Sequence, residues 1–106
     1  MDCNSEKKTE KFLNAIGEPA ALELLAEECA ELAHAALKLA RLERGENPTP
    51  ALPKECQEKI FEEIADVLIS MEVVEQCEWF DGKKTKHYYE AHMRRFAERA
   101  GIRKPL

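Results

Sequence analysis

The sequence predicts an all-α fold of four helices, arranged as a bundle in a single domain over residues 1–106. Apolar residues recur at helical steps of three and four residues along most of the chain. Alternation with period two, the pattern of strands, is absent, and glycines and prolines fall between the periodic segments. A hydrophobic content of 44% excludes a disordered chain, and a length of 106 residues fits one domain.

The first two helices are expected on either side of a glycine. The first should run from about Ser5, a suitable N-cap, to Ile16, with Gly17 as its stop. The second should start near Pro19, which suits a first helical turn, and should end at Gly45. Its apolar residues follow the spacing of a bundle or coiled-coil seam. They are Leu22, Leu25, Cys29, Leu32, Ala36 and Leu39.

A proline-rich loop should separate the second helix from a third. The segment Asn47-Pro48-Thr49-Pro50 should form this loop, because prolines remove backbone donors and disfavour helix just before them. The third helix is expected to begin at Pro53 or Lys54 and to reach about Cys77. Its predicted apolar stripe consists of Ile60, Ile64, Val67, Leu68, Met71 and Val74.

Asp81-Gly82 is a turn signal that precedes a fourth helix, expected from about Thr85 to Ala100. Gly101 should close this helix, and the tail from Ile102 to Leu106 should fray. Its apolar positions are Tyr88, Tyr89, Met93 and Phe96. The second and third helices, at about 25 residues and roughly 37 Å each, carry more apolar surface than one small chain can cover. We therefore expect oligomerisation through the long helices.

Charge and hydropathy narrow the classes of function. The net charge is −5, from 16 basic and 21 acidic residues, which argues against a partner that is a nucleic-acid polymer. No segment is apolar enough to span a membrane, and the polar stretch from Met1 to Lys11 lacks the apolar core of a secretory signal. We therefore expect a cytoplasmic protein with no membrane partner. Cys29 and Cys77 fall within apolar helical patterns and are expected to be buried, reduced thiols.

Two pairs of carboxylates at i and i+3 stand out on the two long helices. Glu28 pairs with Glu31 beside the second helix's seam, and Glu63 pairs with Asp66 on the third. If the helices pack antiparallel, the two pairs can converge. Four converging carboxylates are unfavourable without a cation, and all-oxygen ligation suits Mg²⁺, Mn²⁺ or Ca²⁺. Because Mg²⁺ usually keeps waters and substrate phosphates as ligands, such a cluster indicates phosphate chemistry.

Two other interpretations of these acidic residues exist. A helix rich in glutamate usually presents nothing more than a solvated face, although two matched pairs near apolar seams disfavour that explanation. Glu31 and His34 also form an E-x-x-H, the spacing of di-iron carboxylate bundles. A second E-x-x-H is missing and His34 is turned away from the seam, which argues against iron.

The acidic motifs resemble those of a known enzyme family. E-E-x-x-E at Glu27, Glu28 and Glu31, followed by E-x-x-D at Glu63 and Asp66, resembles the pattern of the all-α nucleoside triphosphate pyrophosphohydrolases. The surrounding segments AEECAELAHAALKL and EEIADVLISME are similar to the MazG-like subfamily of phages and bacteria. The resemblance covers about Leu22 to Glu75, half of the chain.

The resemblance implies a homodimer or homotetramer that uses Mg²⁺, with Mn²⁺ as a substitute, to cleave a (d)NTP between its α and β phosphates, releasing (d)NMP and pyrophosphate. Such an enzyme would serve nucleotide-pool housekeeping. By matched position, the Mg²⁺ ligands would be the carboxylates of both pairs, and Glu27 would orient or activate a water. These residues are Glu28, Glu31, Glu63 and Asp66.

The family also carries basic residues that bind the substrate's phosphates. Lys38, two turns beyond Glu31, and Arg95, on the fourth helix, match such positions, whereas His92 departs from the expected lysine. The segment 40–57 is longer and richer in proline than in compact members, and could be a lid, part of a base pocket or a spacer. Trp79-Phe80 could stack on a base or pack in a core. The alternative function is a non-catalytic helical interaction module of the same fold.

Overall fold

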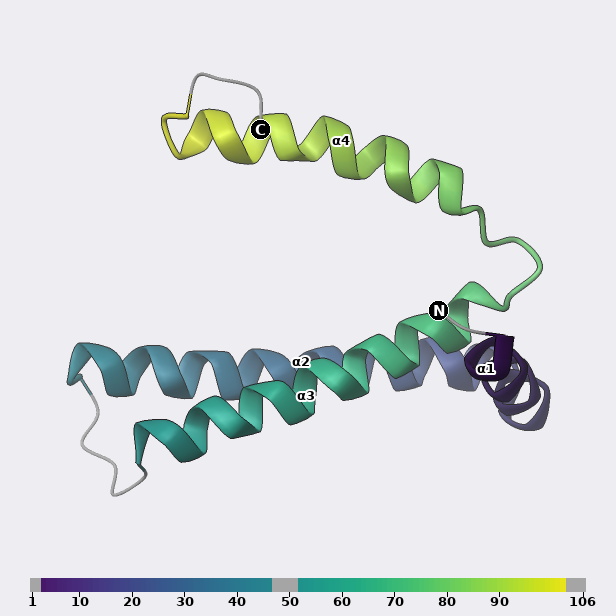
Figure 1. Cartoon of the computed structure of the whole chain (residues 1–106), viewed down its shortest axis with the longest axis horizontal. Coiled ribbons are helices and arrows are strands. Elements are labelled where there is room, and N and C mark those ends of the chain that lie inside the picture. The colour runs from purple at the N-terminus through teal and green to yellow at the C-terminus, as the bar shows by residue number, and fades with distance from the viewer. Residues whose placement is uncertain (1–2, 47–51, 103–106) are drawn as a thin grey trace.

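The computed structural model describes residues 3–46 and 52–102, and within these ranges it contains four helices and no strand. The helices are α1 (Cys3–Ile16), α2 (Glu18–Arg44), α3 (Pro53–Glu75) and α4 (Gly82–Arg99) (Figure 1). The predicted all-α class is thus confirmed for the described residues. Most of the predicted loop, Asn47 to Pro50, and the tail beyond Ile102 lie outside them.

The helix ends follow local signals in the sequence. Gly45 adopts a left-handed conformation (φ 69°), and its N–H donates to the carbonyl of Leu42 (3.2 Å), which ends α2 as expected. The helix α4 begins three residues earlier than predicted, because the Asp81 carboxylate caps it by accepting a hydrogen bond from the N–H of Lys83 (2.9 Å). Similarly, α1 begins at Cys3, two residues before the predicted start.

The helices α2 and α3 form a long antiparallel hairpin, and α1 crosses one of its ends (Figure 1). A small apolar core lies at that end, made by Ala21, Val73 and Val74 with Leu13, Leu25 and Phe80 packed around them. The chain turns back after the end of α3, and α4 runs over the hairpin but apart from it (Figure 1). The arrangement within one chain is therefore more open than a closed four-helix bundle.

The seam between α2 and α3 differs from the predicted one in an informative way. Most buried and half-buried positions on α2 form a line that steps by four and three residues and shares only every second member with the prediction. The members of this line are Ala21, Leu25, Glu28, Leu32, Ala35, Leu39 and Leu42. On α3 the same pattern runs through Cys56, Ile60, Glu63, Val67, Ser70 and Val74, and it continues to Cys77 just beyond the helix. Each helix therefore contributes one glutamate to the interface.

Small residues explain why the helices meet along this line. Ala21, Ala35 and Ser70 are buried, and their short side chains let the two backbones approach closely. The Ser70 hydroxyl donates to the carbonyl of Val67 (2.8 Å), so its burial leaves no unpaired donor. Cys77 is buried as predicted, whereas the prediction for Cys29 is wrong, because the actual seam turns Cys29 outward.

Three apolar residues that the prediction placed in the seam form, together with Phe61, a second stripe on α3, which we call the outer stripe. Its members are spaced three and four residues apart and are exposed. They are Phe61, Ile64, Leu68 and Met71. On α2 the predicted seam residue Leu22 is likewise exposed. The two long helices thus carry apolar surface that the described part of the chain does not cover.

None of the helices in the described ranges combines the length and the apolar character needed to cross a lipid bilayer.

Candidate functional site

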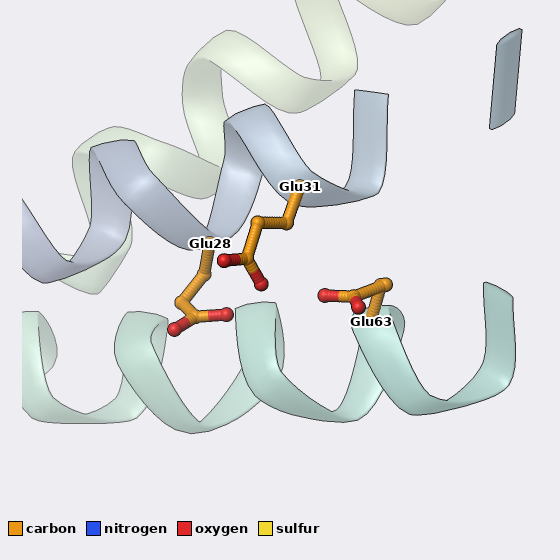
Figure 2. A group of neighbouring side chains, drawn as sticks. All are labelled: Glu28, Glu31 and Glu63. Atoms are coloured by element: carbon orange, nitrogen blue, oxygen red, sulfur yellow. The ribbon is translucent and has the colours of Figure 1, made fainter. Parts of the chain in front are cut away.

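Three of the predicted acidic residues come together between the two long helices. Glu28 and Glu31 extend from α2 toward α3, and Glu63 extends from α3 into the same space (Figure 2). One carboxylate oxygen from each lies within 4.8 Å of the others. Residues 28 and 63 are 35 positions apart in the chain. They converge because α2 and α3 pack antiparallel, which places residue 63 of α3 opposite residue 28 of α2. We call Glu28, Glu31 and Glu63 the acidic cluster.

Burial makes this cluster different from an ordinary acidic surface. Glu63 is only 3% exposed. The Oε2 atoms of Glu28 and Glu63 are both shielded from solvent and have no hydrogen-bond partner among the described residues. A buried carboxylate oxygen without a partner is costly, and native proteins normally satisfy such atoms with a donor or a cation. Two such atoms in one cluster leave two acceptors that a donor or a cation can satisfy.

The pKa of Glu28 reflects the same crowding of carboxylates. Partial desolvation raises its pKa above the ordinary value, and the negative charges of nearby carboxylates raise it further, Glu31 first and then Asp66, Glu63 and Glu27. Asp66 is thus close enough to act on Glu28, although it is not among the three residues whose oxygens meet. Glu27 is exposed beside the cluster. All five predicted acidic residues therefore lie in one region.

Lys59 is a residue of this site that the sequence analysis missed. Its Nζ lies 3.0 Å from Oε1 of Glu63 and 3.8 Å from Oε2 of Glu62. The hydrogen bond to Glu63 raises the pKa of Lys59. The signal was available, because a lysine four residues before a glutamate on a predicted helix lies on the same face. Lys59 neutralises one oxygen of Glu63 and leaves the other unpaired.

A pocket of about 260 Å³ adjoins the cluster on the side toward the end of α2 and the start of α3. It is lined by Ala35, Lys38, Glu55, Cys56 and Lys59. Lys38 was predicted to bind phosphate, and the structure places it in this pocket together with Lys59. The two ammonium groups outnumber the single carboxylate of Glu55, so the lining carries a net positive charge next to the acidic cluster.

Arg95 is not brought to this site within one chain. It is exposed on α4, which runs apart from the hairpin (Figure 1). His92 is exposed on the same helix, and its ring lies near that of Tyr88, at 5.8 Å between centroids.

The aromatic pair lies beside the start of α2, at the opposite end of that helix from the pocket. Phe80 packs against the apolar core, and Trp79 is exposed, with its Nε1–H donating to the carboxylate of Glu18. Since Glu18 is ten residues before Glu28, the pair is about 15 Å along the helix from the cluster. Core packing and a helix-end contact thus account for Trp79-Phe80 in this structure, and base stacking does not follow from it.

The donor set fits a hard divalent cation better than iron. The three clustered ligands are all carboxylates, which Mg²⁺, Mn²⁺ and Ca²⁺ prefer. His34 is exposed and is not a member of the cluster. The residues that would hold the cation are Glu28, Glu31 and Glu63, with Asp66 beside them.

Comparisons with protein-family models, with curated proteins and with solved structures give no significant match to this chain. Membership of the MazG-like superfamily therefore stays a prediction that depends on the acidic motifs.

The crowding of carboxylates predicts that Glu28→Gln stabilises the metal-free protein. A raised pKa in the folded state means that the Glu28 charge opposes folding once the carboxyl ionises. The penalty is complete above the raised folded pKa and disappears as the pH falls from there to the ordinary value of 4.5. In the presence of a chelator at pH 7, we expect Glu28→Gln to raise Tm above that of the wild type.

Circular dichroism melts of wild type and variant across pH 4 to 8 measure this effect. The advantage of the glutamine variant should shrink toward the acid end of the range. Glu23→Gln, on the exposed face of the same helix, is the control and should leave Tm unchanged. An equal Tm for wild type and Glu28→Gln at pH 7 would show that the cluster carries no electrostatic strain.

Proposed function

We propose that this protein is a Mg²⁺-dependent nucleoside triphosphate pyrophosphohydrolase that converts a (d)NTP and water to (d)NMP and pyrophosphate. The observation that carries the proposal is the pair of buried, unpartnered carboxylate oxygens on Glu28 and Glu63, next to a pocket with two lysines. Carboxylates call for a cation and ammonium groups call for an anion. A metal-bound polyphosphate supplies both.

The roles of the residues follow from their placement. Glu28, Glu31 and Glu63, with Asp66, would hold Mg²⁺, which when bound polarises a phosphate and lowers the pKa of a bound water. Glu27 is exposed at the edge of the cluster, where it would orient the attacking water. Lys38 lines the pocket, where its ammonium group would stabilise charge on the departing pyrophosphate. Trimming of the nucleotide pool in the cytoplasm is the corresponding physiological role.

We propose further that the active form is a homo-oligomer. The outer stripe of α3 leaves four large apolar residues exposed, and the core of one chain is small. A second copy would bury the stripe at the spacing of a helical seam. The hairpin of one copy is not covered by the α4 of the same copy. In an oligomer, α4 of a second copy can lie over it and bring the Arg95 of that second copy to the site.

An assay of the purified protein on a panel of NTPs and dNTPs, with and without Mg²⁺, tests the reaction. We expect release of a monophosphate and pyrophosphate that depends on Mg²⁺ or Mn²⁺ and stops when EDTA is added. Identification of both products by chromatography separates this cleavage from loss of the γ-phosphate.

A folded protein that hydrolyses none of the panel with either metal would contradict the proposal. It would favour the alternative of a non-catalytic helical interaction module, for which the exposed outer stripe is the natural docking surface.

A further inference from the structure

Lys59 belongs to two neighbouring features at once. Its ammonium group is paired with Glu63 at 3.0 Å, and its side chain also lines the pocket that contains Lys38. Among the described residues, the other lysine of the pocket has no ion pair to the cluster. Lys59 is therefore the one cationic group in this region that touches both the acidic cluster and the pocket.

The two partners of this ion pair differ greatly in exposure. The side chain of Glu63 is 4% exposed, whereas that of Lys59 is 59% exposed. The carboxylate is held in place by the helix interface, and the long lysine side chain can rotate in solvent at little cost. The second oxygen of Glu63 is buried without a partner, so the single ammonium group does not satisfy this side chain. A divalent cation in the cluster would meet both oxygens with more charge.

We propose that Lys59 exchanges partners. Without a divalent cation it neutralises Glu63, and when a cation occupies the cluster its ammonium group moves into the adjoining pocket. There, with Lys38, it binds an anionic phosphate group. This inference rests on the proposed metal site, and it adds a coupling between cation and phosphate binding that the carboxylates alone do not supply. Lys59 is thus a positioning residue for the cation and a binding residue for the phosphate.

The charges around the pocket set the direction of this coupling. While Lys59 is paired with Glu63, its charge is compensated, and the other charged residues of the lining, Lys38 and Glu55, carry opposite charges. Release of Lys59 adds a second positive charge there. By linkage, if the cation strengthens phosphate binding by some factor, the phosphate that holds Lys59 in the pocket must strengthen cation binding by that same factor.

Isothermal titration of the chelator-stripped protein with Mn²⁺ tests the exchange. Lys59→Met removes the ammonium group that competes with the cation for Glu63. We expect this variant to bind Mn²⁺ about fivefold more tightly than wild type, which corresponds to the free energy of a partly exposed ion pair. Lys38→Met, in the same pocket but without the pair to Glu63, is the matched control and should bind Mn²⁺ as wild type does. Lys59→Arg keeps the charge and should also behave as wild type.

A second series adds inorganic phosphate as the anionic probe. In wild type we expect phosphate to tighten Mn²⁺ binding several-fold, and in Lys59→Met we expect this gain to be smaller. Circular dichroism confirms that each variant is helical, and Lys59→Gln replaces the methionine variant if that one unfolds.

The possible outcomes separate the two proposals. Equal Mn²⁺ affinity for wild type and the neutral Lys59 variants would overturn the exchange and leave the metal site standing. An undiminished phosphate gain in Lys59→Met would overturn the pocket half of the inference. If neither wild type nor Lys59→Met bound Mn²⁺, the metal site and the exchange would both fail.

Discussion

Glu63→Gln is expected to reduce Mg²⁺-dependent hydrolysis by more than about 100-fold while the protein keeps its helical circular dichroism. Substitution of a residue that only supports a metal ligand typically lowers metal affinity or activity by about 10–100-fold, and loss of a ligand should cost more. Glutamine has nearly the same volume as glutamate and can still hydrogen-bond, so the buried position should tolerate it. The same variant should lose the rise in Tm that Mg²⁺ produces in wild type.

The neighbouring glutamate provides a matched control for this test. Glu62 also faces Lys59, at 3.8 Å, but its side chain is exposed and it is not part of the acidic cluster. Glu62→Gln removes the same charge from the same helix and should retain nearly full activity. If Glu63→Gln kept full activity, the assignment of the acidic cluster as the metal site would be wrong.

Leu68→Glu is expected to dissociate the proposed oligomer. Leu68 lies in the middle of the outer stripe, and burying a leucine contributes about 1.5–3 kcal/mol. In a two-fold interface the loss occurs twice and a carboxylate is desolvated as well, so Kd for association should rise by more than about 100-fold. Light scattering after size exclusion should then show a monomer where wild type is a dimer or tetramer.

Ile69→Glu is the control for this prediction. Leu68 and Ile69 are both 53% exposed in the single chain, but Ile69 lies about 100° further around the helix, off the outer stripe. The two variants therefore differ in the face they alter and not in the amount of apolar surface they remove. If both variants dissociated, or neither did, the outer stripe would not be the interface. A monomeric wild type would contradict the oligomer itself.

Local features of the sequence determined most of the fold. The end of α2 follows from the left-handed conformation that Gly45 adopts most easily, and the turn before α4 follows from Asp81-Gly82. These are signals between residues that are close in the chain, so their energies do not depend on distant partners. Four of the five acidic residues were also found from spacing alone, because i and i+3 share a face on any helix, whereas Glu27 came only from the family resemblance.

The choice of seam was decided only by tertiary structure. Both long helices are apolar around more than one face, so their periodicity allows Cys29 or Glu28 to face the partner helix. Close packing favours contact along the line of small residues, the alanines of α2 and the serine of α3, because short side chains allow the backbones to approach. This contact places Glu28 and Glu63 inside the interface. The burial that makes the acidic cluster unusual is therefore a product of helix packing.

The basic half of the site shows the same division. The sequence indicated that Lys38 follows the acidic motif by two turns, but only the antiparallel hairpin places it in one pocket with Lys59. The position of Arg95 depends on how α4 packs, and nothing in the periodicity of α4 specifies that partner. Spacing along the chain thus determined which residues share a helix face. Packing between helices decided which faces meet, because the free energy of burial depends on surfaces that come from distant parts of the chain.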